Sequence, residues 1–154
     1  MAEYEALLAD LEAEQAALDG AVASLDDAAW RTATPAAGWD VRDTIAHLAV
    51  SEEVATTALT DEAAFAARLA DLVVDIEASE AALTEQGRSM PGNEVLEWWR
   101  STRARTIHEL RHRGPRERVP WIAGPMSVTA LAPAADQLAG FRPPIASTLQ
   151  KRVL

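Results

Sequence analysis

Histidine is the residue type in this chain best suited to metal chemistry, since the sequence contains three histidines and no cysteine. The absence of thiols excludes disulfide frameworks, thiolate zinc sites and cysteine nucleophiles. Any bound metal must therefore be held by imidazole nitrogens and oxygen ligands. His47 flanks an apolar stripe that contains Ile45 and Leu48. Taken alone, it is a candidate either for a metal ligand or for a packed histidine whose ring is satisfied within the core.

His108 and His112 form a second candidate site, because a spacing of four places both side chains on one helical face, where they can bind zinc. Their neighbours are mostly charged, and the pair lies off the apolar stripe of its helix. We therefore expect the pair to belong to a solvated polar face. It could replace missing ligands only if that face pointed into the interior.

Apolar residues recur at steps of three and four along most of the chain, which predicts amphipathic helices. The expected helices span residues 4–25, 41–59, 60–74, 76–86, 94–112 and 128–139. No stretch alternates with the period of two that a strand requires, and residues 119–125 are expected to form a structured loop. The pattern predicts an all-α fold, a helical bundle.

Capping residues set the expected ends of these helices. Asp40 is placed to accept hydrogen bonds from the first turn of the helix that carries His47. Asp43 adds negative charge to that turn, which favours the positive end of the helix dipole. Asn93 and Ser127 are expected N-caps, and Gly87 is an expected C-cap.

The bulk composition fits one domain, because the chain has 154 residues. A net charge of −10 and a sequence pI of about 4.7 disfavour a nucleic-acid partner. Half of the 14 lysines and arginines lie in the run 100–118, which we interpret as a solvated helix face. No apolar run approaches the ~20 residues that span a bilayer, and the N-terminus is acidic, so we expect a cytoplasmic protein without membrane contact.

Residues 35–48 match the pattern Pro-x-x-Gly-Trp-x-Val-Arg-Asp-x-x-x-His-Leu. This pattern resembles the metal-binding N-terminal domain of mycothiol-dependent maleylpyruvate isomerases, within the DinB/YfiT-like superfamily of four-helix bundles. The runs 98–100 and 119–127 resemble an actinobacterial subfamily of that group. The resemblance implies a DinB-like four-helix bundle with short extra helices over residues 1–132, followed by an atypical tail over residues 133–154.

The resemblance also implies a divalent metal, zinc or nickel, with His47 as one of three ligands. The other two would come from a Glu-x-x-x-His pair on the fourth helix. Here those positions hold Leu138 and Arg142, which are not ligands. Asp136 could reach a metal only if the final helix shifted in register. Pro133 lies past the first turn of that helix, where it costs ~3 kcal/mol, and is expected to break it.

Three functions remain open on these grounds. The first is a metal-dependent isomerase or transferase that acts on a small molecule with mycothiol as co-substrate, the metal lowering the pKa of the thiol. The second is a non-catalytic family member, truncated or diverged, which could form a homodimer to cover exposed apolar surface. The third is a helical interaction module that uses the basic run 100–118.

The carboxylates and tryptophans near these residues are expected to have structural roles. Glu52 and Glu53 follow His47 by more than a turn and are expected to face solvent. The tryptophans are expected to anchor the core and loops, with one of the adjacent pair pointing away from the main stripe; they are Trp39, Trp98, Trp99 and Trp121.

Overall fold

The computed structural model describes residues 1–137, apart from the side chains of residues 76, 77, 79, 80 and 134–137. Within this range the chain is helical except for one short hairpin, so the all-α class is confirmed. The elements are α1 (Ala2–Val22), α2 (Asp27–Trp30), α3 (Val41–Thr60), α4 (Glu62–Val74), α5 (Ile76–Arg88), α6 (Gly92–Arg111), β1 (Arg118–Val119), β2 (Met126–Ser127) and α7 (Val128–Gln137).

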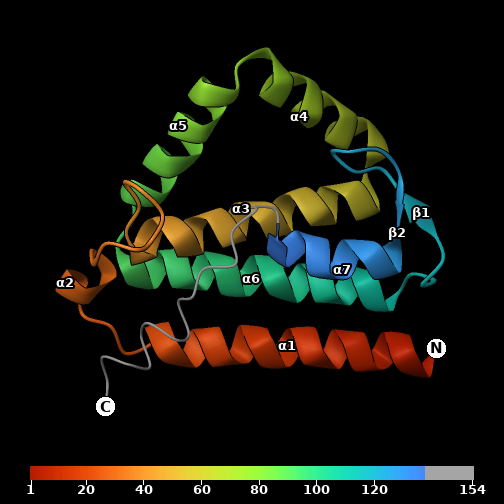
Figure 1. The fold of residues 1–154 in the computed structure, drawn as a ribbon, viewed down its shortest axis with the longest axis horizontal. Helices are drawn as coiled ribbons and strands as arrows, with labels where there is room; N and C mark the ends of the chain where they lie inside the picture. Colours follow the sequence, from red (N-terminus) through yellow and green to blue (C-terminus); the bar gives the residue numbers. More distant parts are fainter. Residues whose placement is uncertain (138–154) are drawn as a thin grey trace.

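Helix α3 is the central element of the molecule. It packs against α6 along its length and also contacts α4, α5 and α7. Helix α1 lies along α6 and α7, while α4 and α5 rise from α3 as an arch (Figure 1). No helix in the described part of the chain is both long and apolar enough to cross a membrane.

The core divides into two clusters along the bundle. One joins α1, α3, α6 and α7, with Leu8, Leu110 and Leu131 fully buried. On the same side, the Tyr4 hydroxyl donates to the carbonyl oxygen of Leu110 at 2.9 Å, which ties α1 to α6. Burial is the main cause that raises the pKa of Tyr4, and the nearby Glu5 carboxylate adds to it.

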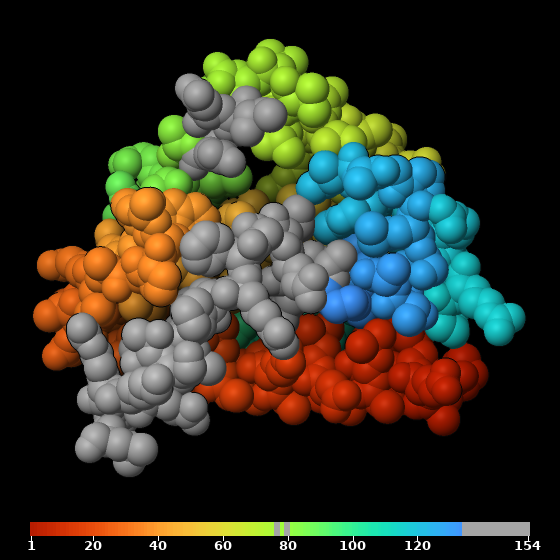
Figure 2. All heavy atoms as spheres, viewed as in Figure 1, coloured from red at the N-terminus to blue at the C-terminus, as the bar shows by residue number. Residues whose placement is uncertain are grey.

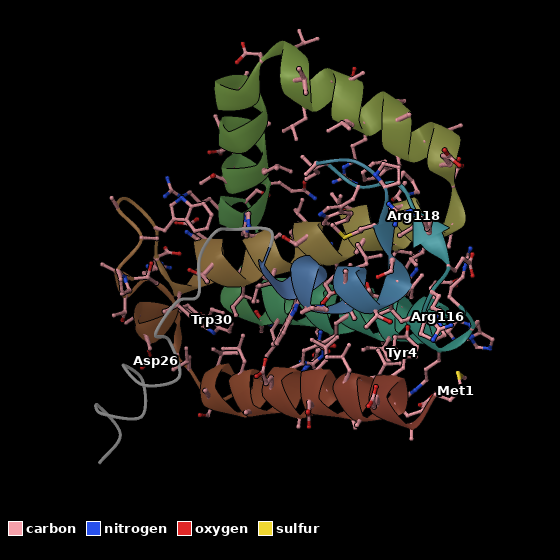
Figure 3. The ribbon with its side chains drawn as sticks, turned by 45° about the vertical axis from the view of Figure 1, so that its right-hand side comes forward. Met1, Tyr4, Asp26, Trp30, Arg116 and Arg118 are labelled. Atoms are coloured by element: carbon pink, nitrogen blue, oxygen red, sulfur yellow. The ribbon has the colours of Figure 1, made fainter. Side chains whose placement is uncertain are left out.

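The second cluster lies at the other end of α3 and α6 and is built around Trp30 and Trp99. Figure 3 shows Trp30, carried by the short helix α2, at this end of the bundle. Its indole leaves no room for a side chain at Gly92, because a Cβ there would come within 2.2 Å of the indole Cγ. Helix α6 begins at this glycine, with Pro91 at the N-cap position. The expectation that Asn93 caps this helix is therefore wrong.

Helix α5 also departs from the expected boundary. It continues through Gly87 to Arg88, so Gly87 is not a C-cap. A Cβ at Gly87 would lie 2.5 Å from the Cβ of Ala46, which shows that this glycine permits close packing of α5 on α3. Close approach of two helices is a contact between distant segments, and local sequence rules do not report it.

Two expectations about the C-terminal part are corrected. Arg118 pairs with Ser127 and Val119 with Met126 in an antiparallel hairpin, which is too short to show an alternating pattern. Helix α7 runs through Pro133 to Gln137 and is not broken there. Its buried residues Leu131 and Ala132 pack in the first core cluster, and tertiary packing of this kind offsets the hydrogen bond that proline removes.

The basic run 100–118 is not simply a solvated face. Arg100 and Arg103 both bind the carboxylate of Asp19 on α1, with nitrogen–oxygen distances of 2.6 Å. The hydrogen bond from Arg100 is the main cause that lowers the pKa of Asp19. Arg111 likewise pairs with Glu12 of α1. These contacts attach α1 to α6 and neutralise much of the run.

Asp43 at the start of α3 fixes the position of α5. Its Oδ2 accepts the Asp40 backbone N–H and its Oδ1 accepts Arg88 Nε, both at 3.0 Å, while Arg88 Nη2 donates to Oδ2 at 2.8 Å. Asp40 caps Asp43 in return, so the expected N-cap is confirmed as a capping box. Burial raises the pKa of Asp43, but the hydrogen bonds from Arg88 and Asp40 outweigh it and leave the pKa below its usual value.

The glycine at the start of α6 gives a first prediction. We expect Gly92→Ala to lower the free energy of unfolding by about 1–3 kcal/mol, because the added methyl group overpacks against Trp30. Gly20→Ala is the matched control, since a Cβ at this exposed position of α1 meets nothing within 4 Å. That control should gain about 0.5–1 kcal/mol from helix propensity. Urea unfolding followed by circular dichroism measures both, and equal stability of the two variants would contradict the packing.

The Asp43–Arg88 pair gives a second prediction, on pH dependence. Because the folded-state pKa of Asp43 lies below its unfolded value of about 3.9, the pair contributes stability above that value and loses it as pH falls through the lower, folded pKa. Asp43→Asn should lower stability at neutral pH and flatten the loss of stability below about pH 4. Thermal unfolding between neutral and acidic pH tests this, with Asp71→Asn, an exposed residue, as control. An unchanged acid slope in Asp43→Asn would refute the assignment.

Candidate functional site

A cavity of about 660 Å³ lies beneath the arch, between α3, α4 and α5. This volume falls within the range of sites that enclose small organic molecules. Figure 2 shows the molecule hollowed below the arch formed by α4 and α5. Its floor is one face of α3, where His47, Val50, Ser51 and Val54 follow each other at helical spacing.

The walls of the cavity are mainly apolar. Helix α4 contributes a single face that carries Phe65, Arg68, Leu69 and Leu72. Helix α5, the loop before α3 and the hairpin loop complete the walls, with Ala82, Leu83, Ala36, Trp39 and Ile122. Most of these side chains can offer a ligand only van der Waals and hydrophobic contact.

His47 lies in the cavity floor and is half-buried rather than turned into bulk water. Its ring lies 5.1 Å from the ring of Trp39, with the two planes tilted by 50°. Trp39 is held by its own loop: Gly38 adopts a positive φ of 79°, and the Trp39 carbonyl accepts the backbone N–H of Thr34 at 2.9 Å. Trp39 is therefore a cavity wall rather than a core anchor.

The remaining predicted metal ligands do not join His47 in the described part of the chain. His108 and His112 are exposed near the end of α6 with ring centroids 4.3 Å apart, and neither lines the cavity. Leu138 and Arg142 lie outside the described residues, as does the side chain of Asp136.

The described lining of the cavity does not offer the donor set of a three-ligand metal centre. Asp43 lines the cavity, but both of its oxygens accept hydrogen bonds from Arg88. Asp71 is an exposed residue of the cavity lining. Among the described residues, no three histidine or carboxylate side chains come close enough to hold one ion. The residues present in this range therefore do not fit the metal that the resemblance implies.

Of the two carboxylates that were expected in solvent, Glu52 is buried and Glu53 is half-buried. Glu52 is 2 % exposed, and its Oε1 accepts the Gln15 side-chain N–H at 2.8 Å. Glu53 accepts the indole N–H of Trp98 at 2.7 Å. The expectation of solvent exposure fails because α3 has packing partners on several sides, which a single apolar stripe does not reveal.

The adjacent tryptophans separate as expected. Trp99 is fully buried in the core, with the guanidinium of Arg103 4.3 Å from the centre of its ring. Trp98 is half-buried and binds Glu53 on α3. Sequence spacing predicts this division, since neighbouring residues on a helix point in directions about 100° apart.

Arg68 is the cavity residue that the sequence analysis missed. It projects from α4, where no motif marks it, and it lines both the main cavity and a smaller polar hollow of about 220 Å³. Its Nη2 lies 3.8 Å from Oε2 of Glu53. Only the packing of α4 across α3 brings these two residues together.

Comparison with known proteins shows which family this chain is similar to. The model of the mycothiol maleylpyruvate isomerase N-terminal domain family matches residues 11–139. Two uncharacterized proteins, from two strains of Mycobacterium tuberculosis, are each 38% identical to the chain over 139 residues. The match covers 87% of this chain and 52% of each relative, so the chain spans about half the length of these curated relatives.

A solved structure supports the fold. The crystal structure of the mycothiol-dependent maleylpyruvate isomerase superposes with a TM-score of 0.64, covering 95% of this chain and 67% of that one, at 14% sequence identity. At this identity the likeness concerns the fold alone. The family match over residues 11–139 shows that the chain belongs to the mycothiol maleylpyruvate isomerase N-terminal domain family.

Proposed function

We propose that this chain is a small-molecule-binding domain of its family, and that the ligand occupies the cavity beneath the α4–α5 arch. The observation that supports this proposal is the cavity itself. It is large enough for an organic ligand, and it is lined mainly by apolar side chains together with a few polar groups. Sites of this composition are typical of small-molecule binding.

His47 is the polar group of the cavity floor that we assign to the ligand. An imidazole can accept or donate a proton near neutral pH, so it can hydrogen-bond a hydroxyl or thiol of the ligand. The family name makes a low-molecular-weight thiol such as mycothiol one candidate. Because the donors among the described side chains do not form a three-ligand centre, we infer that His47 acts here through its hydrogen bonds rather than through a tightly held metal.

The competing interaction-module function receives less support. Three arginines of the run 100–118 are committed to carboxylates of α1, which lowers the cationic charge available to an acidic partner. The non-catalytic alternative remains compatible with the proposal, since a binding domain requires no chemistry of its own.

Dye binding tests the cavity directly. The neutral dye N-phenylnaphthylamine gains fluorescence in apolar sites, and we expect wild-type protein to bind it. Val54→Trp should weaken binding at least about tenfold, because the indole occupies the cavity floor. Val73→Trp is the matched control, since Val73 is 67% exposed and does not line the cavity. Equal binding by both variants, each folded by circular dichroism, would refute the proposed site.

Metal analysis tests the role of His47. We expect purified protein loaded with zinc or nickel and then dialysed to retain well below one equivalent, since one imidazole seldom holds an ion without partners. His47→Ala should leave this amount unchanged. One equivalent in the wild type that disappears in His47→Ala would overturn the inference, and would require further ligands from beyond the described range.

A further inference from the structure

We propose that the ligand is an acidic amphiphile, with an apolar body in the cavity and a carboxylate bound by Arg68. This inference rests on the proposed function, because it names the class of molecule that enters the same site. It follows from the placement of one cationic side chain at the boundary between an apolar and a polar space.

Arg68 lines two adjoining spaces. On one side lies the main cavity with Phe65, Leu69 and the floor of α3. On the other lies the polar hollow, which is lined by four threonines, Glu53, Arg68 and Arg105. A ligand whose apolar part fills the first space therefore brings its polar end to Arg68.

The guanidinium of Arg68 has donors available for such an end. Among the described residues its ion-pair partner is Glu53, and the 3.8 Å between Nη2 and Oε2 exceeds hydrogen-bond length. The other oxygen of Glu53 accepts the indole N–H of Trp98. An arginine presents five N–H groups in a planar fork that matches a carboxylate, so Arg68 can bind one in bidentate fashion while keeping its loose contact with Glu53.

The other charged groups of the cavity are less suited than Arg68 to bind a carboxylate. Asp43 is neutralised by Arg88, and Asp71 is exposed and forms no ion pair within the described residues. Among the described lining residues of the main cavity, Arg68 is the one lysine or arginine.

The threonines of the polar hollow do not compete for an anion. The hydroxyls of Thr57, Thr60 and Thr102 already donate to backbone carbonyl oxygens of their own helices. The protons of these three hydroxyls are therefore not available to a carboxylate. Anion recognition therefore depends on the guanidinium groups. Arg105 lines the polar hollow but not the main cavity, whereas Arg68 lines both.

Displacement of N-phenylnaphthylamine by decanoate and by decanol tests the inference, because the two competitors share a chain and differ in charge. Wild-type protein should bind decanoate about tenfold more tightly than decanol at low salt. Arg68→Gln should reduce the preference to within about twofold, because it weakens decanoate binding more than decanol binding, and decanol should still displace the dye. That retained binding shows that the cavity is still folded.

Two controls isolate Arg68. Arg116→Gln changes the net charge equally at an exposed position outside both cavities (Figure 3) and should keep the preference. Arg105→Gln should also keep most of it. Equal binding of acid and alcohol by the wild type, or a preference that survives Arg68→Gln, would overturn the inference while leaving the cavity intact. Failure of the dye to bind would instead refute the proposed function itself.

Discussion

The buried carboxylate of Asp43 is the constraint on which the cavity depends. A desolvated charge is tolerated only when it is paired and hydrogen-bonded, and Asp43 meets that condition with donors from two separate segments. The Asp40 backbone N–H fixes the start of α3, and Arg88 fixes the end of α5. Arg88 also donates to the carbonyl oxygen of Gly38, so the loop that carries Trp39 is attached to the same centre. One ion pair thus sets the relative positions of three sides of the cavity.

The shape of the cavity follows from an unequal distribution of packing around α3. One side of this helix is covered by α6 and α7, and the apolar core on this side is divided into two clusters. The opposite side is spanned by the α4–α5 arch, which approaches α3 at Gly87 and at Phe65, itself stacked on Trp121. Between these two supports the face that carries His47 is left open to a ligand. The same arch places Arg68 opposite Glu53, which gives the cavity its polar end.

Local rules predicted the parts of the fold that depend on neighbouring residues. The cap at Asp40 and the approximate bounds of α3 and α4 were predicted in this way. Contacts between distant segments were missed, because no local pattern encodes them. Gly87 and Gly92 resemble ordinary helix breakers until Ala46 and Trp30 are placed against them. Likewise Glu52 resembles a surface residue until Gln15 of α1 meets it in the core.

The motif that identified the family also has an architectural explanation that requires no metal. Gly38 allows the turn, Trp39 forms a wall against His47, and Asp43 joins α3 to α5. Of the motif residues, Asp43 and His47 bring ionisable side chains to the cavity, and Asp43 is bound by Arg88. A chain can therefore keep the motif, and with it the cavity, while the groups that select the ligand change. In this chain we assign the selection of the ligand to Arg68, a residue outside the motif. Among the described lining residues, Arg68 alone combines positive charge with contact to both the apolar and the polar space.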